Sequence, residues 1–185
     1  MKPLIKDNLN FKSLRTVKEL IPKKSIVSSF LFYSGALEFN LAEDDRFISA
    51  HTTRYVVYEF WRCALEDPFL VANHAQFFSK LLKDDSQFSN EKTFAILQEN
   101  WPQYKDPWVR SAYFFLLNRC SEKGLISSGK LNLKYFNPLS VLNLKSFKIK
   151  NFHIHFNHEE NFISTLKPAE EVDYLFLPVG KYSYN

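Results

Sequence analysis

The sequence predicts an α/β fold in which a block of helices interrupts a parallel sheet. Two strand–helix units lie within residues 1–67, a strand–helix–strand unit lies within residues 150–185, and the intervening pattern is helical. Glycine is scarce, with four in 185 residues, where average usage gives about 13. No glycines cluster as a phosphate-binding or dinucleotide-binding loop requires. Those two nucleotide-binding classes are therefore excluded.

The first strand–helix unit follows a short N-terminal helix. That helix is expected over Phe11–Leu20, because Pro22 ends the helical pattern. The β-branched and aromatic run Ile26–Tyr33 predicts a buried strand, Ser34-Gly35 a turn and Ala36–Leu41 a helix.

The second unit begins with a short strand predicted over Arg46–Ala50. Thr53 is placed to cap the helix that follows, and Pro68 marks its end. Its apolar residues recur at helical spacing and form one stripe. They are Val56, Val57, Phe60, Trp61, Ala64 and Leu65.

Three helices are expected in the middle of the chain, over Phe69–Leu82, Lys92–Asn100 and Asp106–Cys120. The last begins at an Asp-Pro pair, which is typical of a helix start. Gly124–Tyr135, with its glycines and serines, predicts a loop or an irregular hairpin.

The C-terminal part returns to the alternation of strands and helices. Phe152–Phe156 alternates as a strand does, Glu159–Leu166 has helical spacing, and Tyr174–Val179 is a continuous apolar run. We therefore predict an α/β core of residues 1–67 and 150–185, with a helical insertion of residues 68–149.

Composition narrows the class of protein further. Hydrophobic residues make up 45% of the chain, which is too many for a disordered protein. The net charge of +4 permits contact with nucleic acid without requiring it. Cys63 and Cys120 are too few for a disulfide framework, which favours free buried thiols in a reducing compartment. No apolar run is long enough for a membrane span, so we expect a cytoplasmic protein without membrane contact.

Few residues suggest a site by their pattern alone. His153 and His155 share one face of a predicted strand, but no cysteine or paired aspartate completes a ligand set, and no metal is expected. Nucleophilic catalysis lacks a supporting motif. The Lys123–Lys150 region combines lysines with aromatic residues and has no intervening acidic residue, a pattern suited to phosphate contact.

One stretch is more specific. Asp106–Arg119, which ends in Leu-Asn-Arg, is followed by Gly124-Leu125 and by Gly129–Asn132. This order resembles DNA adenine N6-methyltransferases of the Dam type, in which Leu-Asn-Arg leads into Asn-Gly-Leu and a Gly-x-Phe-Asn hairpin. Ser34–Leu41 is similar to the family's glycine-rich first motif, and Asp173–Gly180 lies where a strand runs into its catalytic Asp-Pro-Pro-Tyr.

The resemblance implies a Rossmann-like sheet of strand order 3-2-1-4, truncated after the fourth strand, with an insertion similar to the family's target-recognition domain. It also implies positions for the sites. The cofactor remnant would consist of Tyr33, Ser34, Gly35 and His51. The position of the catalytic motif is held by Leu177, Pro178, Val179 and Gly180, with Tyr182 as a possible substitute for the aromatic ring. The DNA-binding residues would be Arg119, Lys123, Lys130 and Lys134.

These positions have lost the chemistry of the family. Leu177 accepts no hydrogen bond from an adenine amino group, Gly180 cannot stack on a flipped base, and His51 replaces the ribose-binding aspartate. We expect a catalytically inactive homologue without a cofactor, acting as an interaction or regulatory protein or as a binder of double-stranded DNA. The alternative is an active S-adenosylmethionine-dependent DNA adenine methyltransferase with divergent motifs. Tyr174–Val179 would form an open sheet edge, which predicts a homo-oligomer or a protein partner.

Overall fold

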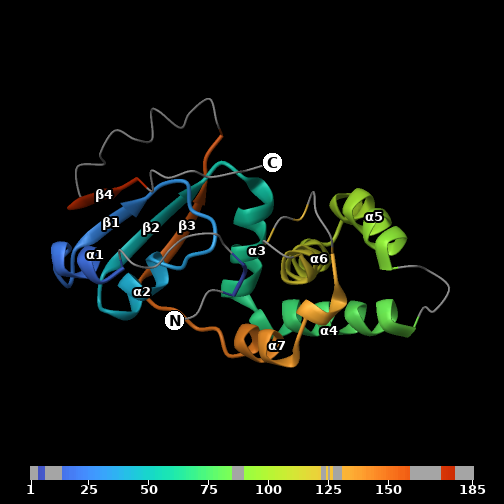
Figure 1. The fold of residues 1–185 in the computed structure, drawn as a ribbon. Coiled ribbons are helices and arrows are strands. Elements are labelled where there is room, and N and C mark those ends of the chain that lie inside the picture. Colours follow the sequence, from blue (N-terminus) through green and yellow to red (C-terminus); the bar gives the residue numbers. More distant parts are fainter. Residues whose placement is uncertain are drawn as a thin grey trace. The chain divides into compact units, whose positions relative to one another are not determined.

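The computed structural model describes residues 4–6, 14–84, 90–121, 124, 126, 131–158 and 172–177 (Figure 1). The chain forms two compact units. The first is built mainly on Leu9–Tyr58 and Lys148–Ser183, and the second mainly on Leu4–Asn8 and Glu59–Phe147.

The first unit contains a sheet whose described strands are all parallel to their neighbours (Figure 1). The strands are β1 (Ile26–Ser29), β2 (Phe47–Thr52), β3 (Phe152–Phe156) and β4 (Tyr174–Phe176). Their order across the sheet is β3-β2-β1-β4. Val27 pairs with Ile48 on one side and with Tyr174 on the other. The predicted α/β class and the predicted strand order are confirmed.

The strand boundaries differ from the prediction for local reasons. β1 ends at Ser29, whereas the apolar run predicted a strand to Tyr33, because Leu31 adopts a left-handed backbone with φ 56°. β2 extends to Thr52, two residues beyond the prediction, because His51 and Thr52 still pair with β3. β4 is described to Phe176.

The helices of the first unit are α1 (Leu14–Leu20), α2 (Glu38–Glu43) and the start of α3 (Tyr55–Glu66). Phe39, Leu41 and Ala42 of α2 are buried. On β2, Ile48, Ala50 and Thr52 are buried while the alternate residues are exposed or half-buried. One face of β2 is thus part of the core, as the period of two along a strand requires. The helix expected over Glu159–Leu166 lies outside the described residues.

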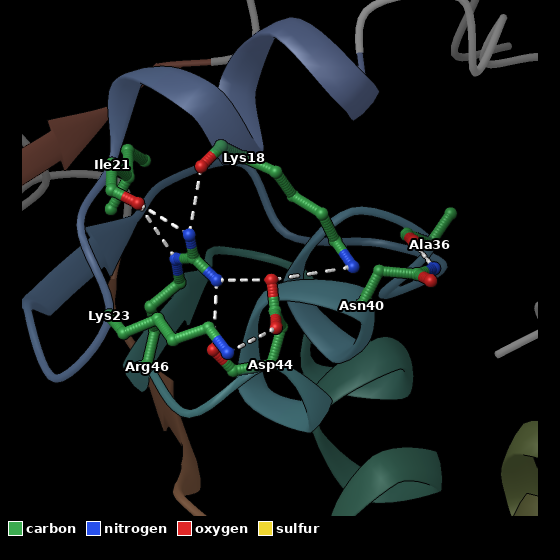
Figure 2. A network of polar contacts seen from close by, with 7 residues as sticks. All are labelled: Lys18, Ile21, Lys23, Ala36, Asn40, Asp44 and Arg46. Atoms are coloured by element: carbon green, nitrogen blue, oxygen red, sulfur yellow. Dashed lines mark hydrogen bonds and ion pairs between the residues drawn. The ribbon is translucent and has the colours of Figure 1, made fainter.

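Arg46 connects α1 to the turn between α2 and β2, and Figure 2 shows its contacts. Its side chain is 3% exposed. Nε and Nη2 donate to the carbonyl of Ile21 at 2.9 and 2.5 Å, and Nη2 also donates to the carbonyl of Lys18 at 2.8 Å. Nη1 donates to the carbonyl of Asp44 at 2.8 Å and to its Oδ2 at 2.6 Å. The guanidinium therefore satisfies carbonyls at the end of α1, which the helix itself leaves without donors.

The second unit is helical in its described part (Figure 1). Besides the end of α3 it contains α4 (Pro68–Asp84), α5 (Asn90–Asn100), the 3₁₀ turn η2 (Trp101–Gln103), α6 (Pro107–Cys120), the 3₁₀ turn η3 (Leu133–Tyr135) and α7 (Pro138–Lys145). The three helices expected in this region are present. Helix α7 was not expected, although Asn137 caps it and Pro138 occupies its first turn, the usual signal of a helix start.

Helix α6 forms the centre of the second unit. Ser111–Asn118 of this helix are all buried, which is typical of a helix surrounded by other helices. Asp106 caps it by accepting hydrogen bonds from the amides of Trp108 and Val109. Arg110 forms a bidentate ion pair with Glu59 of α3, at 2.7 Å for Nε to Oε2 and 2.5 Å for Nη2 to Oε1.

Cys63 and Cys120 are both free and fully buried, as their small number predicted. Burial raises the pKa of both thiols, that of Cys120 to about 12. The thiols are therefore protonated at neutral pH. No helix in the described part of the chain is long and apolar enough to span a membrane.

Candidate functional site

In the first unit, the carboxyl edge of the sheet holds the predicted cofactor residues. In open α/β sheets, ligands bind beyond the carboxyl ends of the strands, where the strand order reverses. Here the chain proceeds from β1 to β2 and β3 on one side and places β4 on the other. The loop after β1 lies at this reversal. Its Phe30 amide donates to the carbonyl of Phe176 at 3.0 Å, and its Phe32 amide donates to that of His51 at 2.9 Å.

The turn at Gly35, the predicted cofactor remnant, is filled by an aromatic ring of the chain itself. Gly35 adopts a left-handed backbone with φ 71°, and a Cβ added there would lie 2.0 Å from the ring of Phe39. Phe39 is 1% exposed and packs against Phe32 and Phe152, with ring centroids 6.0 and 4.8 Å away. The glycine thus leaves room for Phe39.

The polar groups beside this turn are used within the protein. Ser34 is 1% exposed, and its Oγ accepts a hydrogen bond from the Ala36 amide at 3.4 Å. The Ser29 hydroxyl donates to Oε1 of Glu38 at 2.7 Å, and both residues are buried. Tyr33 is half-buried. The sequence did not predict that Glu38 is buried beside this turn; a carboxylate at the start of an expected apolar helix was the only indication of it.

His51 lies at the end of β2 between two rings. Phe30 and His155 stack on it, with centroids 4.7 and 5.0 Å away. Burial lowers the pKa of His51, so the imidazole is neutral at pH 7. Its Nδ1 donates to Oδ1 of Asn157 at 3.0 Å, and its Nε2 accepts from the Ser49 hydroxyl at 3.3 Å. Both ring nitrogens are therefore engaged by the protein.

The position of the catalytic motif begins directly after β4. Leu177 is 44% exposed and carries no polar side-chain atom. Pro178, Val179, Gly180 and Tyr182 lie outside the described residues. The predicted cofactor residues come from two neighbouring segments. The loop after β1 contains Tyr33, Ser34 and Gly35, and the end of β2 contains His51. A backbone hydrogen bond from the amide of Phe32 to the carbonyl of His51 joins the two segments.

The predicted DNA-binding residues belong to the second unit and differ in exposure. Lys134 is exposed on η3, whereas Arg119 is half-buried and donates through Nη1 to the carbonyl of Leu4 at 3.5 Å. Burial lowers the pKa of Arg119, and its Nε has no hydrogen-bond partner among the described residues. Lys123 and Lys130 lie outside the described residues. Lys134 is thus accessible to solvent, as phosphate contact requires, whereas the Arg119 side chain lies largely inside the unit.

Asn118, the central residue of the Leu-Asn-Arg stretch, is fully buried. Its Oδ1 accepts from the amide of Lys6 at 2.7 Å, and its Nδ2 donates to the carbonyl of Gly124 at 2.9 Å. Gly124 has φ 79°, and a Cβ there would lie 2.6 Å from the carbonyl oxygen of Lys6. Asn118 and Gly124 therefore hold the N-terminal segment in place, a role that spacing in the sequence does not reveal.

The second unit also presents an exposed aromatic side chain near Lys134. Tyr135 is 44% exposed, and the ammonium of Lys6 lies 4.6 Å from the centroid of its ring. This cation–π contact places a second positive charge beside η3.

No three His, Cys, Asp or Glu side chains within the described residues lie close enough together to hold a metal ion. Neither a scan of the sequence against protein-family models nor a search of curated proteins gave a match.

Proposed function

We propose that this chain is a catalytically inactive homologue of the DNA adenine N6-methyltransferases that acts as an interaction or DNA-binding protein. The sequence resemblance and the parallel sheet of order 3-2-1-4 support a methyltransferase-like scaffold. A scaffold of this kind hosts many functions, so the function is inferred from the residues of the site. The observation that carries it is the turn at Gly35, which the ring of Phe39 fills.

The filled turn argues against a bound cofactor on steric grounds. A glycine-rich loop holds a cofactor because the absence of side chains lets the ligand approach the backbone. Here Phe32 and Phe39 are 2% and 1% exposed beside the only glycine of the loop. Ligand binding at this turn would require these rings to leave the core, which costs about 2 kcal/mol or more for each ring.

The position of the catalytic motif supports the same conclusion. Adenine methylation requires an acceptor that orients the amino group and a flipped base held by stacking. Leu177 supplies neither an acceptor nor an aromatic ring. The chain would therefore keep the scaffold while the reaction is lost.

Titration calorimetry with S-adenosylmethionine tests this proposal. We expect no binding heat up to about 1 mM ligand, the limit at which a binding free energy near −4 kcal/mol is still measurable. An active DNA adenine methyltransferase in the same buffer serves as the positive control, and circular dichroism checks that the protein is folded. Micromolar binding would instead support the alternative, an active enzyme with divergent motifs.

Exposed basic and aromatic groups at η3 favour DNA as one binding partner. Lys134 and Tyr135 are exposed, and the ammonium of Lys6 lies over the tyrosine ring. Lysines that contact phosphates release counterions, whereas exposed aromatic rings stack on bases. The site would then bind DNA with little dependence on sequence.

Lys134→Ala is expected to weaken binding of double-stranded DNA uniformly across sequences and to reduce the salt slope of log K by about 1. Fluorescence anisotropy over a salt series measures both quantities. Lys92→Ala, which removes another exposed lysine from α5, is the matched control and should leave the slope unchanged. Wild-type affinity that does not change from low to moderate salt would contradict DNA binding through this surface.

The outer edge of β4 remains the predicted site for a protein partner. Within the described residues, β4 pairs only with β1, and Leu175 is 45% exposed. Soluble proteins usually cover or pair such an edge. We propose that a strand of another chain pairs with it.

A further inference from the structure

One face of the parallel sheet carries exposed apolar side chains, and we call it the open face. Successive residues of a strand point to opposite faces. Ile26 and Phe47 pair in register and so share a face, and Leu175 shares it too because its register partner, Ser28, lies two residues after Ile26. Ile26, Phe47 and Leu175 are 38%, 46% and 45% exposed. Parallel sheets occur almost only with both faces covered, so this face requires a covering layer.

The opposite face of the sheet is already covered by helices. Phe39 of α2 packs against Phe152 of β3, with ring centroids 4.8 Å apart. Tyr55, at the start of α3, packs edge-on against Phe156 at 5.4 Å. Phe152 pairs in register with the buried Ile48, which lies on the face opposite to Phe47. A further layer therefore fits only on the open face.

The connection from β3 to β4 has both of its ends fixed beside neighbouring strands. The amide of Asn157 donates to the carbonyl of Thr52 at 3.0 Å, at the carboxyl end of β2. The amide of Asp173 donates to the carbonyl of Ile26 at 3.0 Å, and its Oδ2 accepts from the Ile26 amide at 2.8 Å, at the amino end of β1. The chain between Asn157 and Asp173 must therefore cross the sheet from β3 past β2 and β1 to β4.

The direction of this crossing selects the face on which it lies. Connections between parallel strands of one sheet are right-handed in about 98% of cases. From β1 to β2 the chain moves one way across the sheet, with α2 on the helix-covered face. From β3 to β4 it moves the opposite way, and a crossover of the same hand then lies on the opposite face. The handedness rule thus assigns the β3–β4 connection to the open face.

We propose that residues 159–171 of this chain cover the open face, with the helix expected over Glu159–Leu166 packed against Phe47 and its neighbours. These residues lie outside the described part of the chain, so the proposal rests on the strands at either end and on the sequence. At helical spacing Phe162, Ile163 and Leu166 form one apolar side, and Ser164 falls on the other. The connection is also longer than the dozen or so residues that a parallel crossover needs.

A segment of the same chain is favoured over a separate molecule as the occupant. Its two ends are already tied to strands of this sheet, so covering the face does not incur the loss of translational and rotational freedom that association with a second molecule does. The proposal is independent of the proposed DNA binding. It assigns the face of the sheet to the chain itself and leaves the outer edge of β4 as the surface for a protein partner.

Thiol labelling with Ellman's reagent tests whether the open face is covered. Phe47→Cys places a thiol on this face, and the native Cys63 and Cys120 give no background because both are fully buried. The Phe47→Cys thiol should react at least about tenfold more slowly than that of Leu20→Cys on α1, because it reacts only when the covering segment opens. Leu20 is 68% exposed and is the matched control. Equal rates for the two variants would overturn the proposal.

The protein concentration distinguishes the chain's own segment from a second copy. Protection by residues of the same chain does not depend on protein concentration, whereas protection by a second copy increases with it. We expect the same labelling rate for Phe47→Cys across a dilution series. A rate that rises on dilution would overturn the proposal and identify a dimer interface instead.

Two neighbouring substitutions test which side of the proposed helix faces the sheet. In the Phe47→Cys background, Ile163→Asp places a charge on the apolar side and should raise the labelling rate toward that of Leu20→Cys. Ser164→Asp makes the same change on the other side and should leave the rate unchanged. Reaction of one thiol rather than three shows that each variant is folded, since Cys63 and Cys120 react only on unfolding. Where Ile163→Asp unfolds the protein, Ile163→Ala takes its place, with a smaller increase expected. Equal labelling rates in the variants at 163 and 164 would contradict the proposed packing.

Discussion

Arg46→Ala is expected to destabilise the protein by about 3 to 5 kcal/mol, the cost typical of removing one partner from a buried charged network. The guanidinium is 3% exposed and donates to the carbonyls of Ile21, Lys18 and Asp44 and to the carboxylate of Asp44 (Figure 2). Alanine leaves these acceptors without their donor and opens a cavity between α1 and the turn before β2. Urea denaturation should show a lower midpoint with an unchanged slope.

Two further variants distinguish the contribution of the Arg46 hydrogen bonds from that of a positive charge. Arg46→Lys keeps a positive charge, but its single nitrogen cannot reach all the acceptors at once, so the loss should be intermediate. Arg15→Ala is the surface control, because the Arg15 side chain is 91% exposed in its pair with Glu19, and it should cost less than about 0.5 kcal/mol. An Arg46→Ala variant whose stability lies within about 1 kcal/mol of wild type, the ordinary effect of a point mutation, would show that the network does not contribute as proposed.

The free energy of unfolding at acid pH also depends on this network of Arg46 and Asp44. The hydrogen bond from Arg46 is the main cause that holds the pKa of Asp44 below its ordinary value of 3.8, and the ammonium groups of Lys23 and Lys18 add to it. A carboxylate with a lowered folded-state pKa stabilises the protein above its unfolded pKa and loses this effect as the pH falls through the folded pKa. The stability difference between wild type and Asp44→Asn should therefore shrink below about pH 4.

The sheet could be predicted from the sequence because its signals are local and periodic. Each strand is an apolar or alternating run of residues, and the strand order followed from the resemblance, whereas α7 and the strand ends were not predicted. The end of β1 depends on the left-handed backbone of Leu31, for which the sequence gives no signal. Arg46 was expected within a strand, yet its donors reach carbonyls up to 28 residues earlier in the chain.

The sequence predicted the turn after β1, but not which side chains pack against it. Ser34 and Gly35 marked the turn after β1, yet only the packing shows that Phe39 fills it. Asn118 and Lys6 are 112 residues apart in the sequence, so the hydrogen bond between them could not be inferred from spacing. Long-range contacts of this kind determine whether a motif binds a ligand or supports the fold.

Gly35→Ala is expected to destabilise the protein by about 2 to 4 kcal/mol, from the positive φ and from overpacking together. An alanine at φ 71° is strained, and its Cβ would lie 2.0 Å from the ring of Phe39. Since Phe39 is 1% exposed and packs against Phe32 and Phe152, the ring cannot move away without disturbing the core. Thermal or urea unfolding measures the loss.

Gly35→Ala measured in a Phe39→Leu background distinguishes the two causes of that loss, the backbone strain and the overlap with the ring. Leucine lacks the ring edge that contacts Gly35, so in this background Gly35→Ala should cost only the backbone strain, about 1 kcal/mol. The double-mutant cycle should thus give a coupling of about 1 to 3 kcal/mol between residues 35 and 39. An equal cost in both backgrounds would mean that the ring does not fill the turn, and the steric argument against a bound cofactor would fail even if calorimetry detected no binding. A large coupling together with measurable S-adenosylmethionine binding would instead place the cofactor away from Gly35, because the same space cannot hold both the ring and the ligand.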